Sequence, residues 1–226
     1  MRLIKAIALF FALIVLLLAI PLFFISGHDD ARAPVENEYL PWRIEPLPGG
    51  ASSVFGLTLG ESTLEDAYRR FGGEAQVALL AATGESGSVE AFWDGLNVGF
   101  ITGKMILTLE TTAMQREAMA QRAVKVEFTK SAARRITLAD ADLQAMRQAR
   151  ISGVTFIPTA NLSEEIILQR FGVPGEKIRL DENISHWLYP EKGLDVRLDA
   201  KGKEVLQYVA PRDFGRLREP LLSASR

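Results

Sequence analysis

The chain of 226 residues contains no cysteine. This absence excludes disulfide bonds, thiolate metal sites, cysteine nucleophiles and a lipid-modified N-terminal cysteine. Histidine is almost as scarce, with only His28 and His186. We expect His28, beside Asp29 and Asp30, to lie in a solvated turn, and His186 to be a partly buried structural residue. No second histidine or cysteine is available to complete a zinc set, so we predict no metal site.

The chain also lacks an excess of charge of either sign, with a formal net charge of −2 and a pI of about 5.8. It therefore carries no global basic footprint, and we predict no nucleic-acid binding. No phosphate-binding loop or dinucleotide fingerprint occurs. Gly84-Glu85-Ser86-Gly87-Ser88 ends in serine where a nucleophile elbow needs glycine. Because the usual sets of nucleophile, base and metal are missing, we predict a protein that is not an enzyme and binds no cofactor.

Charge is absent altogether from Ala6 to Ile25, where fifteen of the twenty residues are Leu, Ile, Phe or Val. Twenty residues of helix span about 30 Å, the thickness of the hydrocarbon core of a bilayer. We therefore predict a transmembrane anchor over residues 6–26 after a cytoplasmic stub, residues 1–5. Arg2 and Lys5 precede the span, so the positive-inside rule places the N-terminus in the cytoplasm. In a bacterium, the rest of the chain would then lie in the periplasm, attached to the inner membrane.

A cleaved signal peptide is the alternative interpretation, because Ala31-Arg32-Ala33 has the form of a cleavage site. Against it, the apolar run is longer than the core of a signal peptide, which has about 7–15 residues. Cleavage after Ala33 would also leave Pro34 at the new N-terminus. Prolines and glycines gather between the span and residue 53, which predicts a linker over 27–53.

Short phrases recur along the remaining chain in the same order. "GLTL" at 56 recurs as "GVTF" at 153, "RFG" at 70 recurs at 170, "GLNV" at 95 recurs as "GLDV" at 193, and "GKMIL" at 103 recurs as "GKEVL" at 202. The nearly constant separation indicates a duplication. We predict repeat 1 over 54–111, an insert over 112–152, repeat 2 over 153–210 and a tail over 211–226.

Each repeat shows the pattern of one helix followed by a meander of strands. Ser62-Thr63-Leu64-Glu65 predicts a capping box for the first helix, and Asn161 or Ser163 is expected to cap the second. Gly72 and Gly172 are expected to stop the two helices. The insert is predicted to be mostly helical, with capping boxes at Thr112-x-x-Gln115 and Thr137-x-x-Asp140 and a strand over 124–128. The fold class predicted is α+β: a transmembrane helix, then two repeats of a helix plus an antiparallel meander.

Gly172-x-Pro174 after a short helix, followed by Trp187-x-Tyr189 on a strand, resembles the small outer-membrane-assembly lipoproteins of the SmpA/OmlA (BamE-like) family. The tandem form resembles the architecture of β-lactamase-inhibitor proteins, and the resemblance covers 54–111 and 153–210. The chain departs from the family in its membrane span, its insert and its Gly72-Gly73-Glu74 in place of Gly-x-Pro. The resemblance implies a non-enzymatic envelope protein that binds other proteins across a sheet surface.

The last predicted strand is apolar on both faces, which would leave an exposed apolar strip on a sheet that is covered on one side. Alternation puts Trp187 and Tyr189 on one face of their strand, and puts Val205, Gln207 and Val209 together on one face of the last strand. We take these residues as the candidate partner surface: Val205, Gln207, Val209, Trp187 and Tyr189. Core packing is the alternative, and a tail folded back through Phe214, Leu217 and Leu221 would cover the strip.

These observations predict a protein-interaction module that Ala6 to Ile25 anchor in the inner membrane, with another envelope protein as its partner. The competing hypothesis is a membrane-tethered binder of lipid or another small apolar ligand, with a pocket enclosed by the sheet and the helices.

Overall fold

The computed structural model describes residues 39–73, 75–82, 85–128 and 133–224. The predicted membrane span, from Ala6 to Ile25, and the first part of the predicted linker lie outside the described residues, as does His28. Within the described ranges, no helix is both long enough and apolar enough to cross a bilayer.

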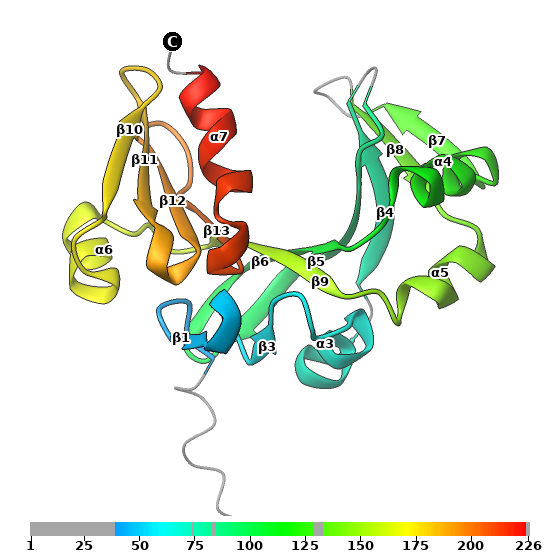
Figure 1. The fold of residues 1–226 in the computed structure, drawn as a ribbon, viewed down its shortest axis with the longest axis horizontal. Helices are drawn as coiled ribbons and strands as arrows, with labels where there is room; N and C mark the ends of the chain where they lie inside the picture. Colours follow the sequence, from blue (N-terminus) through cyan, green and yellow to red (C-terminus); the bar gives the residue numbers. More distant parts are fainter. Residues whose placement is uncertain (1–38, 74, 83–84, 129–132, 225–226) are drawn as a thin grey trace, which may run out of the picture. The chain divides into compact units, whose positions relative to one another are not determined.

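The described chain is a mixed α+β structure with one large antiparallel sheet and five α-helices, which confirms the predicted fold class at this level. The ten strands of the sheet follow the order β10-β11-β12-β13-β9-β6-β5-β4-β8-β7 (Figure 1). Their bounds are β4 Gln76–Ala81, β5 Ser88–Val98, β6 Ile101–Leu109, β7 Lys125–Phe128, β8 Arg134–Thr137, β9 Ile151–Pro158, β10 Glu176–Arg179, β11 Ile184–Tyr189, β12 Leu194–Asp199 and β13 Val205–Val209.

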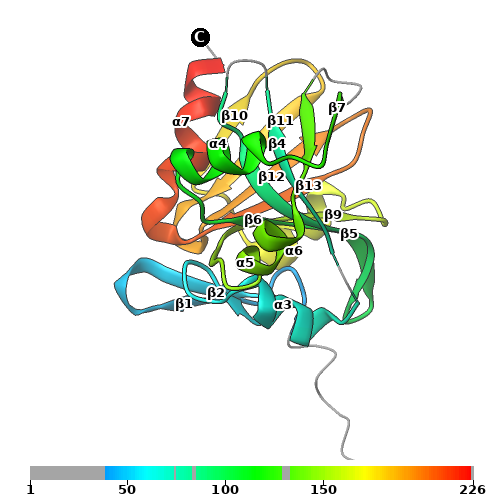
Figure 2. The same ribbon diagram turned by 90° about the vertical axis from the view of Figure 1, so that its right-hand side faces the viewer.

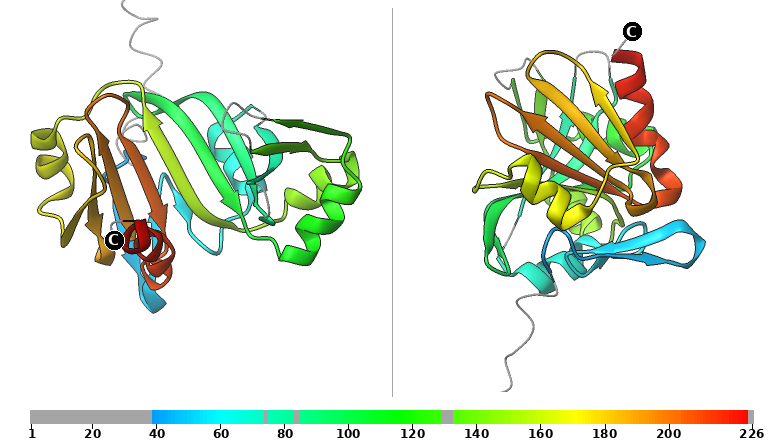
Figure 3. Two further views of the ribbon diagram at one scale, coloured as in Figure 1. Left: turned by 90° about the horizontal axis from the view of Figure 1, so that it is seen from above. Right: turned by 90° about the vertical axis from the view of Figure 1, so that its left-hand side faces the viewer.

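The sheet is bent, and most helices cover its convex face (Figures 1 and 3). The helices are α3 Leu64–Phe71, α4 Ala113–Gln121, α5 Asp140–Met146, α6 Glu164–Phe171 and α7 Gly215–Ala224. A three-stranded sheet packs beside α3 and consists of β1 Ile44–Leu47, β2 Ala51–Val54 and β3 Leu57–Thr58. The main core lies between these elements and the convex face, and it includes Leu64 and Ala67 of α3, Ile167 and Phe171 of α6, and Met105 and Leu107 of β6. Of the helices that the structure describes, α7 alone packs on the concave face (Figure 1). Figure 2 gives a side view of the same elements.

The predicted linker ends earlier than residue 53. Strand β1 and the first three residues of β2 fall inside its last ten residues, Leu40 is buried, and Trp42 packs against the core. The prediction was wrong here because proline and glycine content was taken to mean an open spacer. Pro48 and the left-handed Gly49 instead form the tight turn that joins the two strands.

The two predicted repeats share their helix and the end of that helix. Helices α3 and α6 each have eight residues, and each ends at a glycine with positive φ, 67° at Gly72 and 84° at Gly172. The N–H of each glycine donates to the carbonyl four residues earlier. Phe71 and Phe171 stand directly before these glycines, so the repeated "RFG" phrase marks the same structural position twice.

An aromatic residue from the following meander holds each helix end. The indole Nε1 of Trp93 in β5 donates to the carbonyl oxygen of Gly72 at 3.3 Å, and the Tyr189 hydroxyl in β11 donates to that of Gly172 at 3.0 Å. The ring of Trp93 lies 5.8 Å from Phe71, and the ring of Tyr189 lies 6.1 Å from Phe171. Phe171 is buried and Phe71 is half-buried.

The repeats differ in their strands. The second meander has four strands, β10 to β13, because Pro190 ends β11 and Gly193 turns the chain in a left-handed conformation. The first has three, β4 to β6, because β5 continues through a bulge after Trp93. "GVTF" lies in β9 of the large sheet, whereas Leu57 and Thr58 of "GLTL" form β3 of the small one. Strand β9 pairs with β6 on one side and β13 on the other, so both meanders belong to one sheet.

The insert is less helical than predicted. The strand expected over 124–128 is present as β7, and it pairs with β8 to extend the large sheet beyond β4. The capping box at Thr112 and Gln115 is confirmed. The box predicted at Thr137 and Asp140 is wrong: α5 begins after Ala139, which provides no side-chain cap, while Thr137 completes β8.

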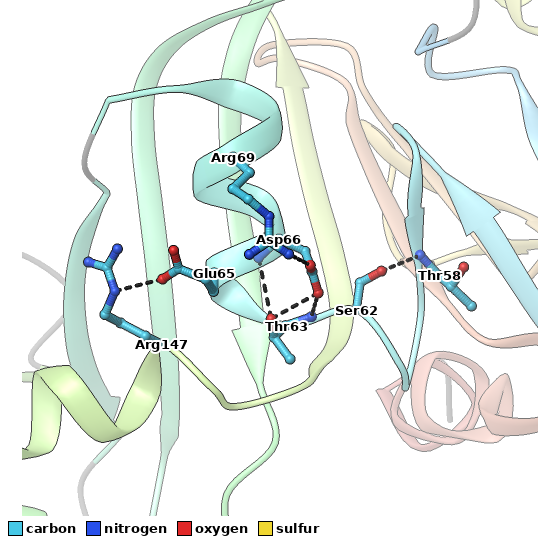
Figure 4. A network of polar contacts seen from close by, with 7 residues as sticks. All are labelled: Thr58, Ser62, Thr63, Glu65, Asp66, Arg69 and Arg147. Atoms are coloured by element: carbon cyan, nitrogen blue, oxygen red, sulfur yellow. Dashed lines mark hydrogen bonds and ion pairs between the residues drawn. The ribbon is translucent and has the colours of Figure 1, made fainter.

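The capping box of α3 lies one residue later than predicted. Thr63 is the N-cap, its Oγ1 accepts from the Asp66 backbone N–H, and Asp66 accepts from the Thr63 N–H at 2.7 Å (Figure 4). That bond, more than the nearby Arg69, lowers the pKa of Asp66. Ser62 instead accepts from the Thr58 N–H, and Glu65 pairs with Arg147 of the insert at 2.7 Å. In the second helix, Ser163 is the cap.

Candidate functional site

The structure separates the five residues predicted to form one partner surface. Val205 and Gln207 are half-buried on the concave side of β13, and Val209 shares that side but is only 5% exposed. Trp187 and Tyr189 face the opposite side and are buried in the main core. The predicted surface therefore does not exist as a unit, and Trp187 and Tyr189 have a packing role.

Helix α7 explains why Val209 is covered. Phe214 packs with Val209, Ile178 and Leu188 in a second apolar cluster. Three further leucines of α7 pack against the same cluster, namely Leu217, Leu221 and Leu222. The Arg218 guanidinium also pairs with Glu176 of β10 at 2.7 Å. The tail thus folds back over the apolar strip. This is the alternative from the sequence analysis in which the strip is covered and is not a partner surface.

Helix α7 covers the concave face of the second meander only. Strand register continues the row of Gln207 across the uncovered part of the sheet. Gln207 lies opposite Thr155, Thr155 opposite Ile106, Ile106 opposite Phe92, and Phe92 opposite Gln76. We call this surface the open face and define it by Leu80, Phe92, Ile106, Thr155 and Gln207. Residues directly opposite each other in neighbouring strands share a face of the sheet.

The burial of β5 and β6 alternates strictly along this part of the sheet. Val89, Ala91 and Trp93 are buried on the convex side, whereas Phe92 is half-exposed on the concave side. In β6, Met105 and Leu107 are buried, and Ile106 between them is half-exposed. Among the described elements, no helix packs on the open face, which presents the half-buried apolar side chains of Leu80, Phe92 and Ile106 opposite a packed convex side.

A shallow hollow of about 210 Å³ lies at the centre of the open face, between Leu80, Phe92 and Ile106. Charged and polar groups border it. Arg135 donates to Gln76 at 2.8 Å on one side, and Lys104 pairs with Asp94 at 2.7 Å near the other. An apolar centre within a polar rim is the usual composition of a protein-binding surface.

The remaining polar groups of the second repeat have structural surroundings. The ammonium group of Lys177 lies 3.5 Å from the centre of the Trp187 ring. Burial raises the pKa of Tyr189 to about 12, so its hydroxyl remains a donor to Gly172 over the physiological range. Tyr208, which is fully buried, donates to the Pro41 carbonyl at 3.0 Å, and burial raises its pKa well above the usual value.

His186 is buried more completely than the partial burial predicted, and its Nδ1 lies 2.8 Å from Oδ2 of Asp195. Burial raises the pKa of Asp195, although the bond to His186 opposes the shift. The pair lies on the concave side of β11 and β12, in register with Leu188 and Arg197, where α7 packs. In the part of the chain that the structure describes, no three His, Asp or Glu side chains form a group that could hold a metal ion.

Sequence reasoning missed the residues at the centre of the open face. A signal was present in "SVEAFWDG", where Phe92 interrupts the polar set Ser88, Glu90 and Asp94, and in "KMILTLE", where Ile106 stands between Lys104 and Thr108. One apolar residue on the polar side of a strand carries little information, but two that lie opposite each other in neighbouring strands form a patch, and the register that joins Phe92 to Ile106 could not be predicted from either strand alone.

Comparisons of the chain with models of protein families, with curated proteins and with solved structures give no match.

Proposed function

We propose that the chain is a non-catalytic protein-interaction module of the bacterial envelope. Residues 6–26 would hold it in the inner membrane, and the folded part would lie in the periplasm. The partner binds the open face, and the observation that carries this proposal is the half-exposed pair Phe92 and Ile106 on a sheet whose other face is packed. The resemblance to envelope proteins that bind partners across a sheet agrees with this proposal.

The competing hypothesis needs a pocket between the sheet and the helices for a lipid or another small apolar ligand. Core side chains such as Leu64, Ile167 and Phe156 fill most of that space on the convex side. The two hollows of about 560 Å³ that remain beside α6 are open to solvent rather than enclosed by the sheet and the helices. Phe214 and Leu188 fill the space beneath α7. The open face, by contrast, is broad and shallow, which suits a protein surface better than a small molecule.

Site-specific photocrosslinking of the full-length chain in cells tests this function. A photoreactive phenylalanine analogue at Phe92 should give a discrete protein adduct, because that side chain lies inside the proposed interface. Phe128 on β7 serves as the control position: it is a phenylalanine outside the open face, and at 74% exposed it is more accessible to chance crosslinking than Phe92. Adding Ile106→Asp should abolish the adduct from position 92 while the chain accumulates normally, because a carboxylate at the apolar centre would lose its hydration when the partner binds.

Equal adducts from positions 92 and 128 would contradict a specific interface. Adducts of position 92 with lipid alone, together with extractable lipid in the purified protein, would favour the competing hypothesis.

A further inference from the structure

The leading segment, Tyr39 to Trp42, lies fixed between the two repeats. Leu40 is 4% exposed, and the carbonyl oxygen of Pro41 accepts the bond from Tyr208. The guanidinium of Arg70 lies 3.9 Å from the centre of the Tyr39 ring, and that of Arg170 lies 4.6 Å from the centre of the Trp42 ring.

These two arginines occupy the equivalent first position of the repeated "RFG" phrase, at the ends of α3 and α6. The duplicated helices therefore hold the leading segment by the same contact, one arginine on each aromatic ring. In the part of the chain that the structure describes, neither guanidinium forms an ion pair, and both residues are exposed. Their positive charge is available to an anionic surface.

An apolar groove of about 560 Å³ opens beside Trp42, between α6 and the turn that joins β5 to β6. Phe100 at that turn is 67% exposed, and its ring lies 6.0 Å from that of Trp42. Ile166, on the outer side of α6, is 38% exposed and lines the same groove. A tryptophan, a phenylalanine and an isoleucine beside an arginine form the combination that suits the boundary between lipid headgroups and acyl chains.

The length of chain before the leading segment limits how far this groove can be from a bilayer. Thirteen residues, 26–38, separate the end of the uncharged run at Ile25 from Tyr39. A chain of that length spans at most about 45 Å when fully extended and about 20 Å on average when flexible. If residues 6–25 cross the membrane, the groove is held within reach of the lipid at a high effective concentration.

We propose that the groove docks on the surface of the inner membrane. Phe100 and Ile166 enter the headgroup region, Trp42 lies at the interface, and Arg170, which lines the groove, contacts lipid phosphates. This inference rests on the membrane anchor of the proposed function and adds an orientation to it. Helix α6, which borders the groove, lies on the convex side of the sheet, whereas α7 lies on the concave side (Figures 1 and 3). The open face is on the same side of the sheet as α7. Docking would therefore direct the open face away from the lipid, toward a partner.

The absence of cysteine allows a direct test on the full-length chain. Phe100→Cys is labelled with an environment-sensitive fluorophore and reconstituted into vesicles of phosphatidylethanolamine and phosphatidylglycerol. Phe128→Cys is the control, because Phe128 is equally exposed but lies on β7 at the far edge of the sheet. We expect a blue-shifted emission at position 100 and several-fold stronger quenching there than at position 128 by lipids that carry a nitroxide on the acyl chain. Arg170→Glu should weaken the quenching at position 100 without changing flotation of the chain with the vesicles.

Flotation separates failure of the docking proposal from failure of the anchor. If the labelled chain floats with the vesicles but the emission and the quenching at position 100 equal those at position 128, the docking proposal is overturned and the anchor remains. A blue shift at position 100 without quenching by nitroxide lipids would mean that protein covers the groove, which also overturns the proposal. A chain that does not float would remove both the anchor and the docking proposal.

Discussion

Asp195 is a buried acid whose hydrogen bonding is incomplete. Its Oδ2 bonds His186, and its Oδ1 is the buried side-chain oxygen without a hydrogen-bond partner in the described chain. Burial raises its pKa above the unfolded value, so folding favours the protonated acid. The resulting contribution to stability is complete below the unfolded pKa of about 3.9 and is lost as the pH rises through the folded value.

Asp195→Asn should therefore raise the thermal midpoint of unfolding at pH 8, because the amide keeps an oxygen for His186 and removes the buried charge. The gain should shrink as the pH falls through the raised folded pKa and should disappear below about 4, where the acid is neutral in both the folded and the unfolded chain. Asp94→Asn is the control: its side chain is 70% exposed, and we expect little change at either pH. A lower midpoint for Asp195→Asn at pH 8 would mean that a charged pair with His186 stabilises the fold.

Phe71 and Phe171 hold equivalent places, but their burial differs. Phe171→Ala should lower the free energy of unfolding by about 3–5 kcal/mol, because the phenyl ring leaves a cavity beside Tyr189. Phe71→Ala should cost less, since its ring is already half in water. Chemical denaturation of both variants, with Gln169→Ala as an exposed control, measures the difference. A silent Phe171→Ala would contradict the packing of the second repeat.

Single residues were predictable from the sequence where the chemistry is local. The "RFG" helix ends follow from glycine, which adopts positive φ without strain. Trp187 and Tyr189 were correctly grouped on one face of a strand. Which face is buried could not be predicted, because alternation sorts residues into two faces and distant elements decide which of them is covered.

At the level of elements, α7 covers the half of the concave face that the second meander forms. Phe214→Ala should lower the free energy of unfolding by about 3–5 kcal/mol, because Phe214 is 6% exposed and packs on Val209, Ile178 and Leu188. Arg218→Ala should cost much less than Phe214→Ala, since its pair with Glu176 is largely solvated. Urea titration distinguishes the two variants. If both cost the same small amount, α7 does not hold its place through apolar packing.

Elements with a complete local pattern were predictable, including α3, α6 and the strand over 124–128. The pairing of β9 with both meanders was not, because register between strands far apart in sequence depends on the whole sheet. The difference between the meanders, three strands against four, comes from what precedes nearly the same phrase: a bulge before "GLNV" and a turn before "GLDV".

For the whole molecule, the proposed topology makes a direct prediction. A reporter that is active only in the periplasm, fused after Arg226, should be active in intact cells, because Arg2 and Lys5 favour a cytoplasmic N-terminus. The fusion should stay with the membrane fraction at its full length. Recovery of a soluble form that begins near Pro34 would show instead that the apolar run is a cleaved signal peptide.

The position of β9 between the two meanders determines how long strand edges stay unpaired while the chain is being synthesised. The 41 residues from 110 to 150 separate β6 from β9, so the edge of β6 has no partner until they have been made. At about 5–20 residues per second, that interval lasts about 2–8 s. A second wait of 46 residues, 159 to 204, follows before β13 pairs with the other edge of β9. An unpaired edge recruits strands from other chains, so the nascent protein is most vulnerable to misassembly during these two intervals.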